Sequence, residues 1–414
     1  MTISLQISAT RTRILELGRW SILLCLFFVP INKPLTNIFI FLALIFSLLG
    51  ERTIERYKAA CKEPVAVGTG IWFLILVLFT VYSPAGAERW IALGKFKALL
   101  YPLIAVTLLE TPQWRKRTLL AFGLSASLIL MISWGQFLGI FRLRDIAQGN
   151  SAYMYTVFKD YSQQALLFLI LAALGASLAH SAVDINRKRF LWLLSAAAFF
   201  NVLFLLQSRT AYLIAIPLLL YWLWQIIGNR RSLILGSVIL GLVIIAASFT
   251  SRVQDRMQQA RQDLSHYSVN HEATSLGIRI ELWKRTLPII QAAPFLGHGI
   301  GQWQIEYENQ TKGLPNFEGF RMEHPHQESL LILSEQGIVG FFIFVTMLIL
   351  LLSYIRRLAA PERHFYTSVL LIYVTAGLAN CILVDFSHRH LFLMLLACIP
   401  FVPSPSKKGF SLTR

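Results

Sequence analysis

The stretch Ile338–Arg357, IVGFFIFVTMLILLLSYIRR, decides the fold class of this chain. Residues 338–355 carry no charge, and a helix needs about 20 apolar residues to cross the hydrocarbon core of a bilayer. A strand here would leave backbone groups unpaired in lipid, whereas a helix satisfies its own. Two arginines, Arg356 and Arg357, follow the apolar run. The stretch therefore predicts a membrane-spanning helix that ends in a basic loop.

Similar apolar stretches recur from Trp20 to Pro400. Hydrophobic residues make up 56% of the chain, charged residues only 14%, and the mean hydropathy is +0.59. This composition is typical of a polytopic membrane protein. The sequence predicts an all-α polytopic membrane protein with about twelve transmembrane helices, near residues 14–31, 35–49, 68–83, 91–109, 118–140, 162–180, 189–207, 210–227, 231–249, 327–355, 365–384 and 387–402.

Clusters of Lys and Arg occupy every second connection between these spans. Short cytoplasmic loops hold an excess of basic residues, so the clusters are predicted to face the cytoplasm together with both termini. The net charge of +17 then reflects membrane orientation and contact with anionic lipid, and no nucleic-acid partner is expected. The clusters are Arg11/Arg13/Arg19, Arg52/Arg56/Lys58/Lys62, Arg115/Lys116/Arg117, Arg187/Lys188/Arg189, Arg230/Arg231, Arg356/Arg357/Arg363 and Lys407/Lys408.

One long polar insertion, residues 250–325, is predicted to lie on the opposite side as a mainly helical cap between spans nine and ten. Its apolar anchors argue against a disordered linker. We expect three regions in the chain and four elements in the insertion. The regions are 1–249 with helices 1–9, 250–325 as the cap, and 326–414 with helices 10–12 and the tail. The elements are a polar helix at 251–264, an amphipathic helix at 275–293, a glycine-rich turn at 294–301 and a short helix at 302–311.

The cysteines predict neither a disulfide framework nor a metal site. Cys25, Cys61, Cys381 and Cys398 all lie outside the insertion, and none forms a Cys-x-x-Cys spacing. The first span is not expected to be a cleaved signal sequence, because no small-x-small site follows it.

Ionisable residues at the outer membrane boundary are the candidate functional residues, since a charge within a span costs about 2.5–3.5 kcal/mol on insertion scales. The candidates are Lys95, Lys97, Arg209, Arg279, His324 and His326. Each has a structural alternative. The lysines could extend to lipid headgroups, Arg209 could cap helix carbonyls, Arg279 could pair with Glu281, and a loop histidine is often structural. Asp385, His388, Arg389 and His390 are interpreted as a polar turn between the last two spans.

Several cations and a histidine at one membrane depth favour a lipid-linked anionic substrate. Arginine offers a fork of donors that suits phosphate oxygens, and lysine offers a compact charge. The sequence contains no Gly-x-x-x-x-Gly-Lys loop for a nucleotide, and the outer segments contain no paired aspartates for a divalent metal. We therefore expect a transfer that needs neither ATP, metal nor cofactor and uses an activated lipid pyrophosphate.

Four motifs in this order resemble those of the O-antigen ligases, within the wider superfamily that includes O-antigen polymerases. They are Arg209–Leu213 (RTAYL), Ser275–Arg279 (SLGIR), Pro294–Gly301 (PFLGHGIG) and His326–Leu330 (HQESL), the last followed by Glu335–Gly340 (EQGIVG). Lys95 is similarly placed to a lysine of the family's fourth span. After His326 this chain has Gln327, where the superfamily more often has Asn or Ser.

The resemblance implies a bacterial inner-membrane glycosyltransferase whose active site faces the periplasm. It would move a completed glycan from undecaprenyl pyrophosphate to lipid A–core with inversion. His326 would be the general base, and Arg209, Arg279 and Lys95 would bind the pyrophosphate. His324, Glu323, Glu328 and Lys97 would be supporting residues.

Two other functions stay open at this point. An O-antigen polymerase would use the same donor on both sides, so its donor residues would look alike. A transporter of lipid-linked oligosaccharides would usually show repeat symmetry and a polar site near the bilayer midplane. This sequence shows neither feature.

Overall fold

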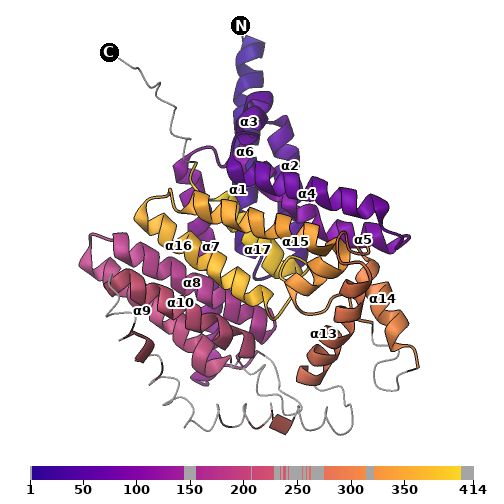
Figure 1. Ribbon diagram of the computed structural model, residues 1–414. Coiled ribbons are helices and arrows are strands. Elements are labelled where there is room, and N and C mark those ends of the chain that lie inside the picture. The colour runs from indigo at the N-terminus through magenta and orange to yellow at the C-terminus, as the bar shows by residue number, and fades with distance from the viewer. Residues whose placement is uncertain are drawn as a thin grey trace, which may run out of the picture.

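The computed structural model describes residues 2–143, 155–206, 208–227, 275–313 and 321–401, together with isolated residues between 234 and 262. Over these residues the regular secondary structure is entirely helical, as the sequence predicts (Figure 1). The helices are α1 (Thr2–Phe28), α2 (Lys33–Leu49), α3 (Thr53–Ala60), α4 (Pro64–Tyr82), α5 (Glu88–Phe96), α6 (Tyr101–Leu108), α7 (Pro112–Phe137), α8 (Tyr161–Ser181), α9 (Ile185–Phe200), α10 (Arg209–Ile227), α13 (Ser275–Ala292), α14 (Gln302–Thr311), α15 (Glu328–Ile355), α16 (Ala360–Gly377) and α17 (Phe386–Ala397). A 3-10 turn (Lys97–Leu100) joins α5 to α6, and a π turn (Asn201–Leu205) follows α9.

Six helical segments are long and apolar enough to cross a membrane: α4, residues 88–108, α7, α8, residues 185–205, and α15. A seventh results if the bent pair α2 and α3 counts as one span. The prediction of about twelve spans is therefore not confirmed. Helices α1, α10, α16 and α17 occupy positions of other predicted spans without meeting the same criteria over the described residues. The predicted span at 231–249 lies largely outside the described residues.

Side chains that accept backbone N–H groups cap the starts of at least five helices in the described part of the chain, and three of these caps lie near the candidate residues. Asp160 caps α8, Gln327 caps α15 and Asp385 caps α17. Each capping oxygen satisfies an N–H group that has no partner within the first turn. Gln327 thus performs the capping role that Asn or Ser commonly performs, with the oxygen of a longer amide. The starts of α8 and α17 lie together, because Gln163 Nε2 donates to Asp385 Oδ2 over 2.9 Å.

The connections α3–α4, α6–α7, α8–α9 and α15–α16 lie together, and we call this the basic end of the helix bundle. Arg115 bonds Glu63 over 2.5 Å and also donates to the carbonyl of Ile399. Ser177, near the end of α8, donates to the carbonyl of Pro361 at the start of α16. Alternate connections therefore share one end, in agreement with the pattern of basic clusters. The opposite end, where α8, α15 and α17 begin, is called the site end.

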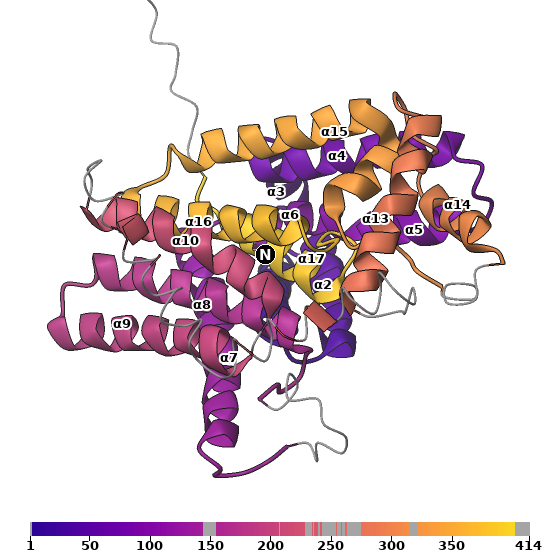
Figure 2. The same ribbon diagram turned by 60° about the horizontal axis from the view of Figure 1, so that its bottom comes forward.

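Helices α13 and α14 form a small cap at the site end, beside α5 and the start of α15 (Figure 2). They match the helices predicted at 275–293 and 302–311. The predicted helix at 251–264 lies almost entirely outside the described residues. The cap has its own apolar core, which consists of Leu282, Ile289, Trp303, Tyr307, Leu331 and Cys381. Its residues come from α13, α14, α15 and the α16–α17 connection, so the cap is fixed to the bundle.

The glycine-rich turn Pro294–Gly301 is bonded to a break in α15. At Gly337 the backbone has φ +62° and ψ −165°, which interrupts the helix. Four backbone hydrogen bonds of 2.8–3.2 Å join the turn to this break. Their donors are Ile338, Val339, His298 and Gly299, and their acceptors are Pro294, Phe295, Ser334 and Glu335.

Two glycines allow this close approach. A Cβ atom on Gly297 would lie 2.4 Å from the backbone of Gln336, and one on Gly337 would lie 2.3 Å from the backbone of Phe295. Both residues also have positive φ, which disfavours any side chain. The Pro-x-x-Gly-x-Gly motif is thus a structural joint between the cap and α15.

Candidate functional site

Arg279, on α13, is half-buried at the site end. Burial, followed by the nearby charge of Arg209, lowers the pKa of its guanidinium. Its other electrostatic neighbour is Tyr161, at the start of α8. The partner suggested by the sequence, Glu281, instead pairs with Arg285 over 2.5 Å. Arg279 therefore adds positive charge where another cation already lies, which favours a negatively charged ligand.

Arg209 is the first residue of α10, and the π turn Asn201–Leu205 ends four residues before it. Such turns inside helices are rare and often occur at functional sites. Ser208 Oγ accepts the backbone N–H of Ala211 over 3.3 Å, which anchors the start of α10. Arg209 is thereby held at a helix N-terminus, where the backbone dipole adds further positive potential.

His326 lies between the cap and α15 and has an unusual backbone. Its φ is +53°, a left-handed conformation uncommon for residues other than glycine. Strain of this kind costs of order 1–3 kcal/mol and tends to occur at functional positions. Burial, followed by the charge of Arg279, lowers the pKa of the imidazole, so His326 is neutral near pH 7. Its Nδ1 lies 3.3 Å from Oδ1 of Asn380.

The residues just before His326 join it to Lys95. Lys95 Nζ bonds Glu323 Oε2 over 2.7 Å, and this ion pair lowers the pKa of the Glu323 carboxyl. The ring of His324 contacts that of His326, with centroids 4.5 Å apart. Burial, followed by the electrostatic effect of the adjacent His326 ring, lowers the pKa of His324 to about 4. Neutral histidines and one paired lysine thus extend the site away from Arg279.

Lys95 and Glu323 also line a polar pocket between α5 and the cap. Its other polar residues include Glu88, Gln304 and Glu335. The carboxylate of Glu335 accepts the backbone N–H of Gly301 over 2.8 Å, so it holds the glycine-rich turn in place. This pocket gives Lys95 an open space beside its side chain.

The other two supporting residues predicted from the sequence, Glu328 and Lys97, interact with the α16–α17 connection and with α17. Glu328 is buried, and its Oε2 accepts the backbone N–H of Leu383 over 3.1 Å. This contact ties α15 to the α16–α17 connection. Lys97 is exposed on the 3-10 turn, and it is an electrostatic neighbour of His390 on α17. The structure therefore brings Arg209, Arg279 and His326 together, places Lys95 near Glu323 and His324, and places Lys97 near His390.

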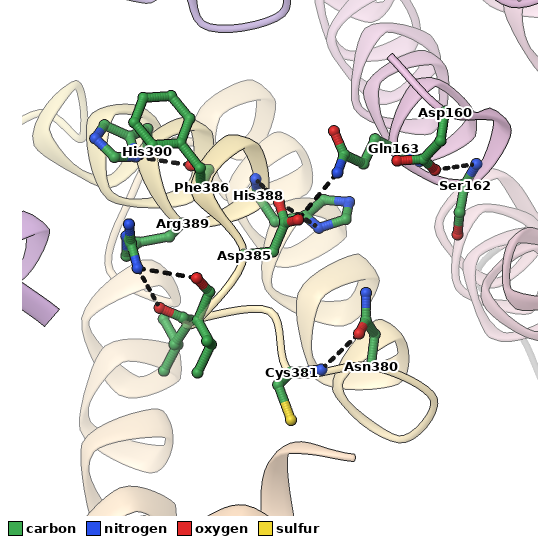
Figure 3. Close-up of polar contacts among 12 residues, drawn as sticks. Asp160, Ser162, Gln163, Asn380, Cys381, Asp385, Phe386, His388, Arg389 and His390 are labelled. Carbon is green, nitrogen blue, oxygen red and sulfur yellow. Dashed lines mark hydrogen bonds and ion pairs between the residues drawn. The ribbon is translucent and has the colours of Figure 1, made fainter. Parts of the chain in front are cut away.

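The interpretation of Asp385, His388, Arg389 and His390 as a polar turn is wrong. Asp385 is the cap of α17, and the other three are buried within its first turns (Figure 3). They are buried because α17 packs among α4, α6 and α16 at this level. Arg389 Nη1 donates to the carbonyls of Leu383 and Val384, and His390 Nδ1 lies 2.7 Å from the Phe386 carbonyl.

Sequence reasoning missed Asn380. This residue lies in the α16–α17 connection, where its Oδ1 accepts the backbone N–H of Cys381 over 2.9 Å (Figure 3). It also lines a small cavity with Ser162, Thr210 and His388. A single amide within the apolar segment 365–384 was the only available signal, and nothing local connects it to His326.

Within the described residues, no group of three or more His, Cys, Asp or Glu side chains is arranged to hold a metal ion. The chemistry available there consists of half-buried guanidiniums, a neutral imidazole with a defined partner, and an exchangeable ion pair. Such groups can bind an anionic leaving group and accept a proton.

Comparison with known proteins identifies the same region. Residues 193–345 match the sequence model of the family described as O-antigen ligase. The chain is 27% identical over 180 residues to an O-antigen ligase of Escherichia coli K12, which covers 41% of this chain and 42% of that protein. It is 24% identical over 144 residues to an uncharacterized protein of Haemophilus influenzae, which covers 33% of this chain and 35% of that protein.

Each match thus spans less than half the length of the curated relative. The family segment contains the three residues that the structure brings together, Arg209, Arg279 and His326, and it excludes Lys95 and Asn380. It also contains the Gly297–Gly337 joint that fixes the cap to α15. The resemblance to the O-antigen ligases that the ordered motifs predict is thus confirmed over residues 193–345.

Proposed function

We propose that this protein is an inverting glycosyltransferase that moves O-antigen glycan from undecaprenyl pyrophosphate to lipid A–core at the periplasmic face of the bacterial inner membrane. The similarity of residues 193–345 to the O-antigen ligase family and the helices long and apolar enough to cross a membrane support this proposal. The observation that carries it is the position of Arg279, which is an electrostatic neighbour of both Arg209 and His326. A leaving-group clamp and a base within one small region are what this transfer requires.

His326 acts as the general base. The acceptor sugar hydroxyl gives its proton to the neutral imidazole as its oxygen attacks the anomeric carbon of the donor glycan. A new glycosidic bond forms while the bond from that carbon to the pyrophosphate oxygen breaks. Undecaprenyl pyrophosphate leaves with the bonding electron pair from the opposite face, which inverts the configuration. General-base assistance of this kind is worth about 10²–10⁴ in rate.

Arg279 and Arg209 bind the pyrophosphate and stabilise the negative charge that develops on it. Two forked guanidiniums can each contact two phosphate oxygens. Because Arg279 is half-buried beside Arg209, an anion relieves the repulsion between them. The positive charge near His326 also keeps its imidazole neutral and ready to accept a proton.

Lys95 binds the same anion after exchanging its partner Glu323 for a phosphate oxygen. This ion pair is partly exposed, with 28% of the Lys95 and 61% of the Glu323 side chain accessible, so it is weak enough to exchange. His324, Glu323 and Glu328 support this region through the contacts described above. Lys97 is the least favoured of the predicted supporting residues, because it is exposed and its electrostatic neighbour is His390 on α17.

The orientation in the membrane follows from the two ends of the bundle. The basic end would face the cytoplasm with both termini, and the site end would face the periplasm. Accessibility labelling of single cysteines placed at Lys188 and Lys312, both exposed at opposite ends, tests this assignment. A residue 312 cysteine that reacts only after the inner membrane is permeabilised would overturn it.

Reconstitution tests the transfer itself. The purified protein in liposomes, supplied with undecaprenyl-pyrophosphate glycan and rough lipopolysaccharide, is expected to give glycan-substituted lipopolysaccharide on a gel. His326→Ala should abolish the product, whereas His180→Ala, an exposed histidine at the basic end, should leave it unchanged. Lengthened donor glycan without substituted lipopolysaccharide would instead identify a polymerase, and donor movement between leaflets without transfer would identify a transporter.

Metal removal is a further arm of this experiment. Because guanidinium groups, rather than a metal ion, would neutralise the negative charge of the pyrophosphate, we expect excess EDTA to leave the transfer rate unchanged. Loss of activity that added Mg²⁺ restores would contradict the metal-free mechanism.

A further inference from the structure

Asn380 is the polar side chain that faces the candidate base from another element. It lies between α16 and α17, 54 residues along the chain from His326. Its Oδ1 accepts the backbone N–H of Cys381 over 2.9 Å, and the same oxygen lies 3.3 Å from His326 Nδ1. Figure 3 shows the contact between the Asn380 side chain and the backbone N–H of Cys381.

This geometry determines which tautomer of His326 is compatible with the fold. A backbone N–H can only donate, so the atom of Asn380 that faces Cys381 is the carbonyl oxygen rather than the amide nitrogen. An amide oxygen can only accept, so the His326 nitrogen facing it must carry the hydrogen. In a neutral imidazole that hydrogen on Nδ1 leaves the lone pair on Nε2.

We propose that Asn380 is a positioning residue that holds His326 with the hydrogen on Nδ1, so that Nε2 is the atom that accepts the substrate proton. This inference rests on the proposed transferase function. Asn380 itself touches neither substrate and acts only through the imidazole.

The surrounding contacts keep the two residues at a fixed separation. Glu328, two residues after His326, accepts the backbone N–H of Leu383, three residues after Asn380. On the other side, Trp283 Nε1 donates to the carbonyl of Pro325 over 3.1 Å. Both sides of the His326–Asn380 contact are therefore tied to neighbouring elements, and the left-handed backbone of His326 is maintained by these ties.

A neutral partner suits a base that lies among cations. An aspartate at position 380 would stabilise the imidazolium and raise the pKa of His326, whereas the amide fixes the tautomer with a smaller effect on that pKa. The titratable and charged groups around His326 include Arg279 on α13, Arg209 on α10, His324 and Glu323 on the preceding loop, Lys95 on α5, Glu328 on α15, Cys381 in the α16–α17 connection, and Asp385 and His388 at the start of α17.

Two substitutions at position 380 have opposite expected effects on the pH profile of transfer. The wild-type rate falls at low pH as His326 becomes protonated. Asn380→Asp still accepts from Nδ1, so the rate at its pH optimum stays within about fivefold of wild type, but the acid limb moves to higher pH. Asn380→Ala removes a contact that raises the pKa of His326, so the acid limb moves to lower pH. Its maximal rate falls about 10- to 100-fold, as for other residues that orient an imidazole.

The matched control is Asn309→Asp, the same change at an exposed position of α14, which should shift neither the rate nor the profile. The reconstituted liposome assay is run from pH 5 to 9, with thermal unfolding of every variant measured in parallel. Equal acid limbs in wild type, Asn380→Asp and Asn380→Ala would overturn the positioning role, even if both variants were slower. Absence of transfer by wild type would instead refute the proposed function, so the two failures are distinguishable.

Discussion

The two ends of the helix bundle use arginine in different ways. At the basic end, Arg56 and Arg115 are buried and satisfied by the protein itself. Arg56 donates to the carbonyls of Glu51, Ser47 and Thr107, and Arg115 bonds Glu63 and donates to the carbonyls of Leu109 and Ile399. These arginines complete helix ends and join neighbouring helices. Because the protein itself supplies the acceptors for these guanidinium groups, they do not need a bound ligand.

At the site end, Arg279 has a cation, a tyrosine and a neutral histidine as its neighbours. Burial of positive charge beside more positive charge is unfavourable unless a ligand supplies the opposite charge. The difference shows that counting basic residues is a poor guide to function in this chain. What distinguishes Arg279 is the absence of Asp or Glu among the neighbours that shift its pKa, judged over the described part of the chain.

The sharpest test of this comparison is to remove one arginine from each end. Arg279→Gln should lower the transfer rate about 10²- to 10³-fold with an unchanged melting temperature, because a charge-stabilising donor at the leaving group is lost. Arg187→Gln, at an exposed position of the basic end, should have no effect on rate. Arg279→Lys should recover only part of the activity, since one ammonium cannot replace a fork. A transfer rate for Arg279→Gln within a few-fold of wild type would show that Arg279 does not bind the leaving group, and the contrast between the two ends would fail.

The opposite outcome is expected for Arg115. Its removal leaves the partly buried Glu63 carboxylate without its partner, which should destabilise the fold by up to about 3 kcal/mol. Thermal unfolding in detergent should show a clear loss for Arg115→Gln and none for Lys116→Gln, its exposed neighbour. The Arg115→Gln protein that remains folded should transfer glycan at the normal rate. If that protein were instead stable and inactive, the basic end would contain functional residues as well.

A third substitution tests how the site end is constructed. Gly337→Ala places a Cβ against the backbone of Phe295 and imposes an unfavourable φ, so it should detach the glycine-rich turn from the α15 break. We expect lower thermal stability and at least a tenfold loss of transfer, because α15 begins two residues after His326. Gly68→Ala, in an open position on α4, should be neutral or slightly stabilising. An active and stable Gly337→Ala variant would show that the joint does not position the base.

The sequence predicted those features that are local or periodic. Basic clusters in alternate connections anticipated that these connections share one end, and the apolar spacing of 275–293 anticipated α13. The residues Arg209, Arg279 and His326 were found because charge at a membrane boundary is costly. Their roles in catalysis stay proposals.

Contacts between distant segments could not be predicted. The Lys95–Glu323 pair joins residues 228 positions apart, and Gly297 meets α15 only because both backbones bend away from regular structure. Asn380 has no motif around it, so its relation to His326 appears only in three dimensions. The polar residues of α17 were misassigned because a charged run usually faces water, and here the packing around α17 buries it.

The smallest expected effect concerns Lys95, which combines both uses of a cation. It pairs with Glu323, as a basic-end arginine pairs with its carboxylate, yet it also lines the polar pocket between α5 and the cap. Exposed ion pairs contribute at most about 1 kcal/mol, which corresponds to about fivefold in affinity. Removal of the competing carboxylate in Glu323→Gln should therefore lower KM for the lipid pyrophosphate by about two- to fivefold with kcat unchanged.

The control is Glu308→Gln, which changes a partly exposed acid on α14 and should leave KM unchanged. A higher KM in Glu323→Gln would mean that Glu323 holds Lys95 in its binding position rather than competing with the phosphate, and Lys95 would then depend on its acid just as Arg115 does.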